Sequence, residues 1–206
     1  DKLEDRKGSK VIKTKEMKIL YGILTCYTMC DLETYTSLFE YADVLLPKVD
    51  DISDSFIKTA YLGRIKECLS FAYLVQDKLE NLRSTCHEIL ELEDPESCFN
   101  LLRASALVYL AESFTFECYD SASKYIKESL VQLEPYYFER EKQRRQEILN
   151  TYAFIKLVNK KELDKIKIYH PAEESFLEII KGNYKSAVTI LNDLEKKNGF
   201  LTPMQH

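Results

Sequence analysis

The most reactive side chains in this sequence are six cysteines and three histidines, and their spacing fits no metal site. Cys26 and Cys30 lie one helical turn apart, and the other cysteines occur singly as Cys68, Cys86, Cys98 and Cys118. No CxxC pair occurs, and the histidines complete no ligand spacing (His87, His170 and His206). We therefore expect reduced, mostly buried thiols in a reducing cytosol, with no metal and no disulfide.

Catalytic motifs are also missing from the sequence. No Gly-rich phosphate loop, paired carboxylate site or set of nucleophile, base and acid can be picked out. We expect a protein that is not an enzyme and that uses no cofactor. No run of about 18 apolar residues occurs, so we expect no membrane span.

The segment that most resembles a nucleic-acid patch is the basic run 140–145, followed by Lys160, Lys161, Lys165 and Lys167. The run alternates with acidic residues, lacks interleaved aromatic residues, and lies in a chain of net charge −5. We interpret it as a solvated helix face.

The elements that would position any site follow from an apolar pattern that occurs four times. Its members have offsets of zero, three, seven and ten, which place them on one stripe of an α-helix. The four copies are Tyr35/Leu38/Ala42/Leu45, Leu79/Leu82/Cys86/Ile89, Tyr119/Ala122/Ile126/Ser129 and Tyr184/Ala187/Leu191/Leu194. Recurrence at about 40 residues indicates a helical repeat protein rather than an enzyme core.

The five prolines divide the chain into helical hairpins. Proline is tolerated in a first helical turn and breaks a helix interior, so each one predicts a helix boundary (Pro47, Pro95, Pro135, Pro171 and Pro203). Together with the apolar pattern they predict one all-α domain over 1–206, with hairpins at about 10–46, 51–92, 95–133, 138–170 and 171–200. The abrupt start at Asp1 and the end after Pro203 predict a fragment of a longer protein.

The hairpins carry the signature of tetratricopeptide repeats. The first-helix pattern appears as Leu69-Ser70-Phe71-Ala72-Tyr73 and as Leu110-Ala111-Glu112-Ser113-Phe114; the second-helix pattern appears as Tyr119 with Ala122 and as Tyr184 with Ala187. Small residues at these places let paired helices approach closely. We expect a superhelical stack of antiparallel hairpins, a fold that usually builds a binding surface.

The groove of such a stack is lined by first-helix residues that face away from the second helix. Counting from Ser70 and Ala111 gives two sets of candidates: Arg64, Glu67 and Phe71, then Ser105, Val108, Glu112 and Thr115. Arg64 could clamp a peptide carboxylate with two bonds, or pair internally with Glu67 or Glu112. Glu112 could bind a basic peptide side chain or remain a solvated charge.

Nearly the whole chain resembles the arbitrium receptors (AimR-like proteins), the phage branch of the Rap/PlcR/NprR-type peptide receptors of Gram-positive bacteria. The residues that carry the resemblance are Ser53-Asp54-Ser55-Phe56-Ile57 with Tyr61 and Arg64, Leu110-Ala111-Glu112-Ser113-Phe114-Thr115-Phe116, and Ser175-Phe176-Leu177-Glu178 continuing into Ala187-Val188-Thr189-Ile190-Leu191. Such receptors join a DNA-binding helix-turn-helix to a solenoid that captures a short signalling peptide.

The resemblance implies a cytoplasmic regulator of lysis and lysogeny in a bacterial host cell, in which this chain binds the peptide. DNA would be bound only through an N-terminal domain absent from this chain, and a homodimer is compatible with the resemblance. Receptors of this kind hold the peptide backbone with asparagines, whereas this chain has Leu62 or Gly63 and Glu112 at the corresponding places. Asn150 remains as a candidate clamp. The alternative function is a tetratricopeptide adaptor, or a divergent paralogue, that binds a protein partner without sensing a peptide.

Overall fold

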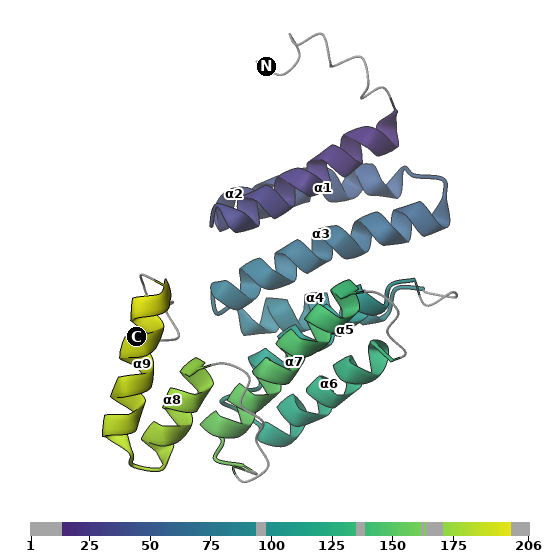
Figure 1. Cartoon of the computed structure of the whole chain (residues 1–206). Helices are drawn as coiled ribbons and strands as arrows, with labels where there is room; N and C mark the ends of the chain where they lie inside the picture. The colour runs from purple at the N-terminus through teal and green to yellow at the C-terminus, as the bar shows by residue number, and fades with distance from the viewer. Residues whose placement is uncertain (1–13, 94–97, 135–138, 162, 164–170, 199–206) are drawn as a thin grey trace. The chain divides into compact units, whose positions relative to one another are not determined.

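The computed structural model describes residues 14–93, 98–134, 139–161, 163 and 171–198, and every regular element in this part is helical (Figure 1). The helices are α1 (Lys15–Asp31), α2 (Tyr35–Asp50), α3 (Ser55–Val75), α4 (Leu79–Leu90), α5 (Asn100–Ser113), α6 (Tyr119–Gln132), α7 (Glu139–Val158), α8 (Pro171–Ile180) and α9 (Tyr184–Asn198). The predicted all-α, tetratricopeptide-like fold class is confirmed. The chain forms two compact units, Asp1–Tyr109 and Leu110–His206, with the boundary inside α5.

The first unit is built on the packing of α1, α2 and α3, each of which contacts the other two, while α4 packs against α3. Its core takes one stripe from each helix. In α1 the stripe is Ile19, Ile23, Cys26 and Cys30, whose spacing of three to four residues keeps them on one face. The same core contains Leu38, Ala42, Leu45 and Val49 of α2, Ile65, Cys68, Leu69 and Ala72 of α3, and Ile52 from the segment between these two helices.

In the second unit, α7 packs against both α6 and α8, and α8 packs against α9. Ile126 of α6 and Ile148, Ile155 and Leu157 of α7 are almost completely buried. The first turns of α7 are charged and the apolar residues come later, so the helix is polar at its start and buried toward its end.

The repeated apolar pattern lies on the buried faces of α2, α4, α6 and α9. The second, third and fourth members are buried in the first three of these helices, and in α9 Ala187 and Leu194 are buried while Leu191 is half-buried. The first member stays partly exposed in every copy. As predicted, Ala122 and Ala187 are buried, with 0% and 2% of their surface exposed. A small residue there allows a neighbouring helix to come close.

Within the described part of the chain, four helices end in the same backbone turn. One residue in each has a left-handed φ: Glu33 (57°), Asp77 (55°), Lys160 (52°) and Gly182 (82°). After α1, for example, Glu33 N–H donates to Cys30 C=O at 3.1 Å and Thr34 N–H donates to Met29 C=O at 2.9 Å. This is the Schellman motif, which satisfies carbonyls at the helix end and reverses the chain within a few residues.

Two predicted helix boundaries in the first unit were wrong. Pro47 was expected to end a helix, but it lies inside α2, which continues to Asp50. Proline removes one hydrogen bond near the end of the helix, and completely buried Val49 keeps the following turn packed. The second hairpin was expected to begin at about residue 51, but α3 begins at Ser55 and is capped by Asp54, whose Oδ1 accepts from Ile57 N–H at 2.8 Å.

The other prolines differ in outcome. Pro171 is the first residue of α8, as its preference for a first helical turn predicts. Pro95, Pro135 and Pro203 lie outside the described residues, as does the predicted helix start near Lys10. The helix that was expected there begins, within the described part, after Thr14, whose Oγ1 accepts from Met17 N–H at 3.2 Å.

Candidate functional site

The predicted groove residues of the first unit meet a tyrosine from the neighbouring helix. Arg64 Nη1 donates to Glu67 Oε2 at 2.8 Å, one turn farther along α3. Tyr27 Oη of α1 donates to the same Glu67 oxygen at 2.7 Å. The internal Arg64–Glu67 pair, one of the two alternatives for Arg64, is therefore formed. The Glu67 side chain is 14% exposed and that of Arg64 is 37% exposed, so a partly exposed cation lies on a nearly buried carboxylate.

Burial and the neighbouring groups fix the protonation states of Tyr27 and Arg64. Burial and the Glu67 carboxylate raise the pKa of Tyr27 far above its ordinary range, so its hydroxyl keeps its proton. Burial alone would lower the pKa of Arg64, but Glu67 and the Tyr27 hydroxyl more than offset this, and the net shift is upward. The cluster therefore holds a permanent guanidinium charge at the surface of α3.

A chain of aromatic rings begins beside this cluster. Phe71 lies one turn beyond Glu67 on α3 and is half-buried. Its ring centroid is 6.4 Å from that of Tyr35 of α2, in an edge-to-face arrangement, and 6.5 Å from that of Tyr109 of α5. Aromatic pairs at such distances gain from edge-to-face geometry in addition to apolar burial. The first unit thus combines an aromatic surface with a cation.

Ser105 and Val108, which were predicted to line the next part of the groove, are buried in α5. They are 6% and 4% exposed. Ser105 also makes polar or electrostatic interactions of its own. Both side chains belong to the packed interior of the fold in this structure.

In the second unit, Glu112 is a half-buried carboxylate. Burial raises its pKa to about 7, and the nearby Arg144 of α7 opposes this rise. Thr115, predicted beside it, is buried, and its hydroxyl donates to Ala111 C=O at 3.2 Å. The Glu112 carboxylate therefore titrates near neutral pH.

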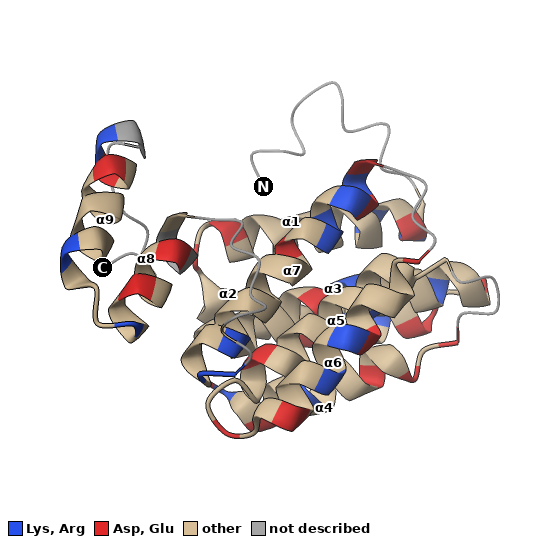
Figure 2. Ribbon diagram, turned by 60° about the horizontal axis from the view of Figure 1, so that its bottom comes forward, with Lys and Arg blue, Asp and Glu red and all other residues tan. Residues whose placement is uncertain are grey.

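Asn150 is half-buried on α7, where its Oδ1 accepts from Gln146 Nε2 at 3.0 Å. The basic run on the same helix is matched by acids. Lys142 pairs with Glu139 at 3.1 Å and Arg144 pairs with Glu147 at 2.8 Å. Figure 2 shows Lys and Arg interspersed with Asp and Glu over the described helices. These pairs favour the interpretation of a solvated helix face.

The candidates thus fall into two groups. Arg64, Glu67 and Phe71 share one face of α3 in the first unit, whereas Glu112 and Asn150 belong to α5 and α7 in the second unit. The residue that sequence reasoning missed is Tyr27. It lies 40 residues before Glu67, which is the interval of the repeat. Comparing equivalent first-helix positions one repeat apart could have found it.

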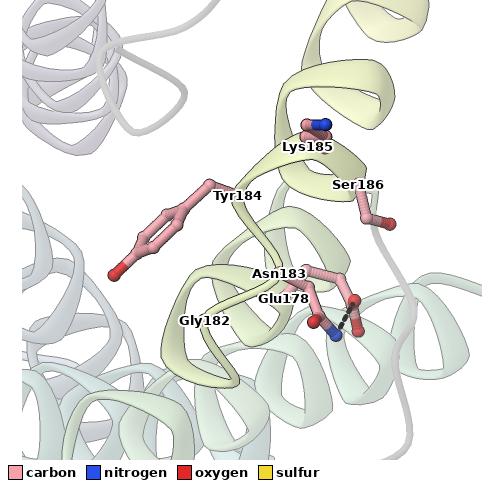
Figure 3. A pocket seen from close by; sticks show the side chains of 6 residues that line it. All are labelled: Glu178, Gly182, Asn183, Tyr184, Lys185 and Ser186. Carbon is pink, nitrogen blue, oxygen red and sulfur yellow. Dashed lines mark hydrogen bonds between the residues drawn. The ribbon is translucent and has the colours of Figure 1, made fainter.

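A shallow pocket lies at the turn between α8 and α9 (Figure 3), and it is lined by Glu178, Gly182, Asn183, Tyr184, Lys185 and Ser186. Its carboxylate is already engaged: Glu178 accepts from Lys181 Nζ and from Asn183 Nδ2, both at 2.9 Å. These bonds, that from Lys181 first, lower the pKa of Glu178. The contacts close the hairpin turn, and Gly182 supplies its left-handed residue.

Neither a metal-binding cluster nor a membrane-spanning helix occurs among the residues that the structure describes. Within them, three or more His, Cys, Asp or Glu side chains are nowhere grouped in a way that could hold a metal ion. In that same part of the chain, no helix combines the length and the apolar character that crossing a membrane requires.

The chain is similar to one protein family, to a protein of related sequence and to solved structures. The family model described as "AimR transcriptional regulator-like" matches residues 3–206. An uncharacterized protein of Bacillus anthracis is 60% identical over 206 residues, which are 100% of this chain and 76% of the relative.

Solved structures of phAimR share the fold at low sequence identity. The selenomethionine form has a TM-score of 0.73 at 19% identity, over 93% of this chain and 48% of that one. The structure of phAimR with a ligand has a TM-score of 0.72 at 19% identity, over 93% of this chain and 55% of that one. The chain thus spans about half the length of these solved chains.

Proposed function

The chain belongs to the AimR transcriptional regulator-like family, and from this premise we propose that it is the peptide-binding repeat region of a phage or prophage regulator that controls the choice between lysis and lysogeny. The bound molecule is a short signalling peptide. DNA is contacted through a separate domain outside this chain. Two observations support the proposal: the family match, and the likeness in fold to the structure of phAimR with a ligand.

The single observation that carries the peptide site is the cation on α3. Arg64 is partly exposed while its partner Glu67 is nearly buried, so the guanidinium can accept a second anionic group from the solvent side. A guanidinium has five N–H donors, and the bond to Glu67 uses one of them. The ring of Phe71 on the same face offers apolar contact for a peptide side chain. We assign the peptide's carboxylate to Arg64 of the first unit.

A second candidate function is a tetratricopeptide adaptor, or a divergent paralogue, that binds a protein partner and senses no peptide. The observation that favours it is the internal Arg64–Glu67 pair, because a paired guanidinium has less to gain from a ligand. Glu112 at a place where related receptors use an amide points the same way.

Calorimetry against a library of six-residue peptides tests the proposal. We expect saturable binding by the 206-residue chain, and we expect Arg64→Ala to weaken it about 10- to 150-fold, the value of a hydrogen bond to a charged group. Lys58→Ala is the matched control, since Lys58 is another α3 cation in an ion pair, with Asp50 at 3.0 Å. It should bind like the wild type.

The two functions predict different results in this experiment. A chain that binds no peptide from the library, yet retains a specific protein partner, would be an adaptor. Peptide binding that Arg64→Ala leaves unchanged would keep the function and remove Arg64 from the site.

A further inference from the structure

The Glu67 carboxylate is a junction between two helices. Its Oε2 accepts one bond from Tyr27 of α1 and one from Arg64 of α3, at 2.7 and 2.8 Å. Tyr27 and Glu67 are 40 residues apart in sequence, so this contact links neighbouring repeats. The Tyr27 hydroxyl also interacts with the Arg64 guanidinium. The three polar groups thus form one cluster that is centred on the Glu67 carboxylate.

The burial of the three side chains assigns them different roles. Glu67 is nearly buried, so its charge needs donors, and it has two. Arg64 is more exposed than Glu67, and Tyr27 is half-buried. A long arginine side chain loses rotamer freedom when it binds a ligand, and a fixed partner removes part of that cost in advance. Holding Glu67 in place therefore holds the guanidinium in place.

We propose that Tyr27 is a positioning residue for the binding site: by donating to Glu67, it fixes the carboxylate that orients Arg64 toward an anionic group of a peptide. The ligand class is a peptide with a free carboxylate, most simply at its C-terminus. This inference rests on the proposed function. Tyr27 does not itself contact the ligand, and its effect passes through Glu67 and Arg64.

Tyr27→Phe tests the inference because it removes the hydroxyl and keeps the ring. The probe is the same six-residue library in two forms, one with free C-terminal carboxylates and one with C-terminal amides. We expect the wild type to prefer the free acids, and we expect Tyr27→Phe to weaken binding of the free acids about 3- to 10-fold, the value of one hydrogen bond. Binding of the amides should change little, so the acid-to-amide ratio falls.

A merely structural role would give a different result. If Tyr27 only joins α1 to α3, its loss should lower the thermal stability and weaken acids and amides alike, leaving their ratio unchanged. Tyr21→Phe is the matched control, since Tyr21 is an exposed tyrosine on the same helix. Glu67→Gln is measured in parallel, because it should lower the same ratio without altering α1, and it keeps the test valid if Tyr27→Phe folds poorly.

A double-mutant cycle completes the design. In an Arg64→Ala background, Tyr27→Phe should no longer change the acid-to-amide ratio, because the group that it positions is gone. An unchanged ratio in both Tyr27→Phe and Glu67→Gln, with the wild type binding free acids, overturns this inference and leaves the proposed function standing. Failure of the wild type to bind either form overturns the proposed function, and the inference with it.

Discussion

Gly63 of α3 faces the side chain of Leu102 in α5 so closely that a Cβ at position 63 would overlap Leu102 Cδ2. Leu92 Cδ1 would lie 3.3 Å from the same Cβ. Leu102 is 2% exposed and has little room to move. Gly63 thus allows α3 and α5 to approach next to Arg64, and its place in a helix interior follows from packing rather than from backbone freedom.

We therefore expect Gly63→Ala to destabilise the protein by about 1–2 kcal/mol, because overpacking exceeds the gain in helix propensity. Urea denaturation measures the change. In a Leu102→Ala background the same substitution should lose its cost, since the colliding atoms are gone. Equal stability of Gly63→Ala and wild type would show that Leu102 repacks freely.

Asp77→Gly should stabilise the protein. Asp77 has a φ of 55° in the turn after α3, and a residue with a Cβ pays about 1–2 kcal/mol in this conformation. Glycine avoids that cost but loses more entropy on folding, so we expect a net gain of about 0.5–1 kcal/mol. Thermal unfolding measures it. Gly182→Ala makes the opposite change at the equivalent turn after α8, so it should lower the stability of the protein. If both variants raised the stability, or both lowered it, the two turns would not share the same backbone conformation.

The cysteines should react in two classes. Cys98 and Cys118 are exposed, while Cys26, Cys30, Cys68 and Cys86 are buried. A hydrogen bond from Ser121 lowers the pKa of Cys118, whereas burial raises that of Cys26 to about 11. Titration with a thiol reagent should label two thiols in the native protein and all of them in denaturant. Rapid labelling of Cys26 in the native protein would mean that the buried face of α1 becomes exposed to solvent.

Glu112 should make the stability of the fold depend on pH in the range between its pKa in the unfolded chain and its pKa in the folded protein. Burial raises its pKa from 4.5 to about 7, against the pull of Arg144. The folded state then binds the proton more tightly than the unfolded chain, so this contribution is complete at low pH and is lost as the pH rises toward 7. The loss is at most about 3 kcal/mol.

Glu112→Gln should flatten this part of the pH profile of the unfolding free energy, measured in urea from about pH 4 to about pH 8. Glu128→Gln is the control, since Glu128 is an exposed carboxylate of the same unit with Lys124 at 3.9 Å. Its profile should follow the wild type. A Glu112→Gln profile as steep as the wild type would assign the dependence to other groups.

The sequence was sufficient to predict the helices and their buried faces because periodicity reports burial directly. Ala122 and Ala187 were placed correctly since a small residue in an apolar stripe indicates a close helix approach. The helix end predicted at Pro47 was wrong because that prediction considered only the backbone of proline. The buried side chain of Val49 keeps α2 helical beyond Pro47. Left-handed turns at Glu33, Asp77 and Lys160 carry no glycine to mark them.

The candidate site was only partly predictable. Counting along α3 gave Arg64 and Glu67, which share a face at a spacing of three residues. Tyr27 could not be found that way, because its contact with Glu67 depends on how α1 packs against α3. The burial of Ser105 likewise depends on neighbouring helices and not on its position along α5. Spacing along the sequence therefore predicted the residues on α3, whereas the contribution of α1 became visible only from tertiary packing.

The ring chain through Tyr35, Phe71 and Tyr109 also has an optical consequence. The sequence has 14 tyrosines and no tryptophan, so an indole introduced at position 71 would be the sole long-wavelength emitter. Its neighbours in the chain, with centroids 6.4 and 6.5 Å from the present ring, would act as excitation donors. Light absorbed by tyrosine would then be emitted from the face that also carries Arg64. The wavelength of that emission would report whether this face is exposed to water or covered by a ligand.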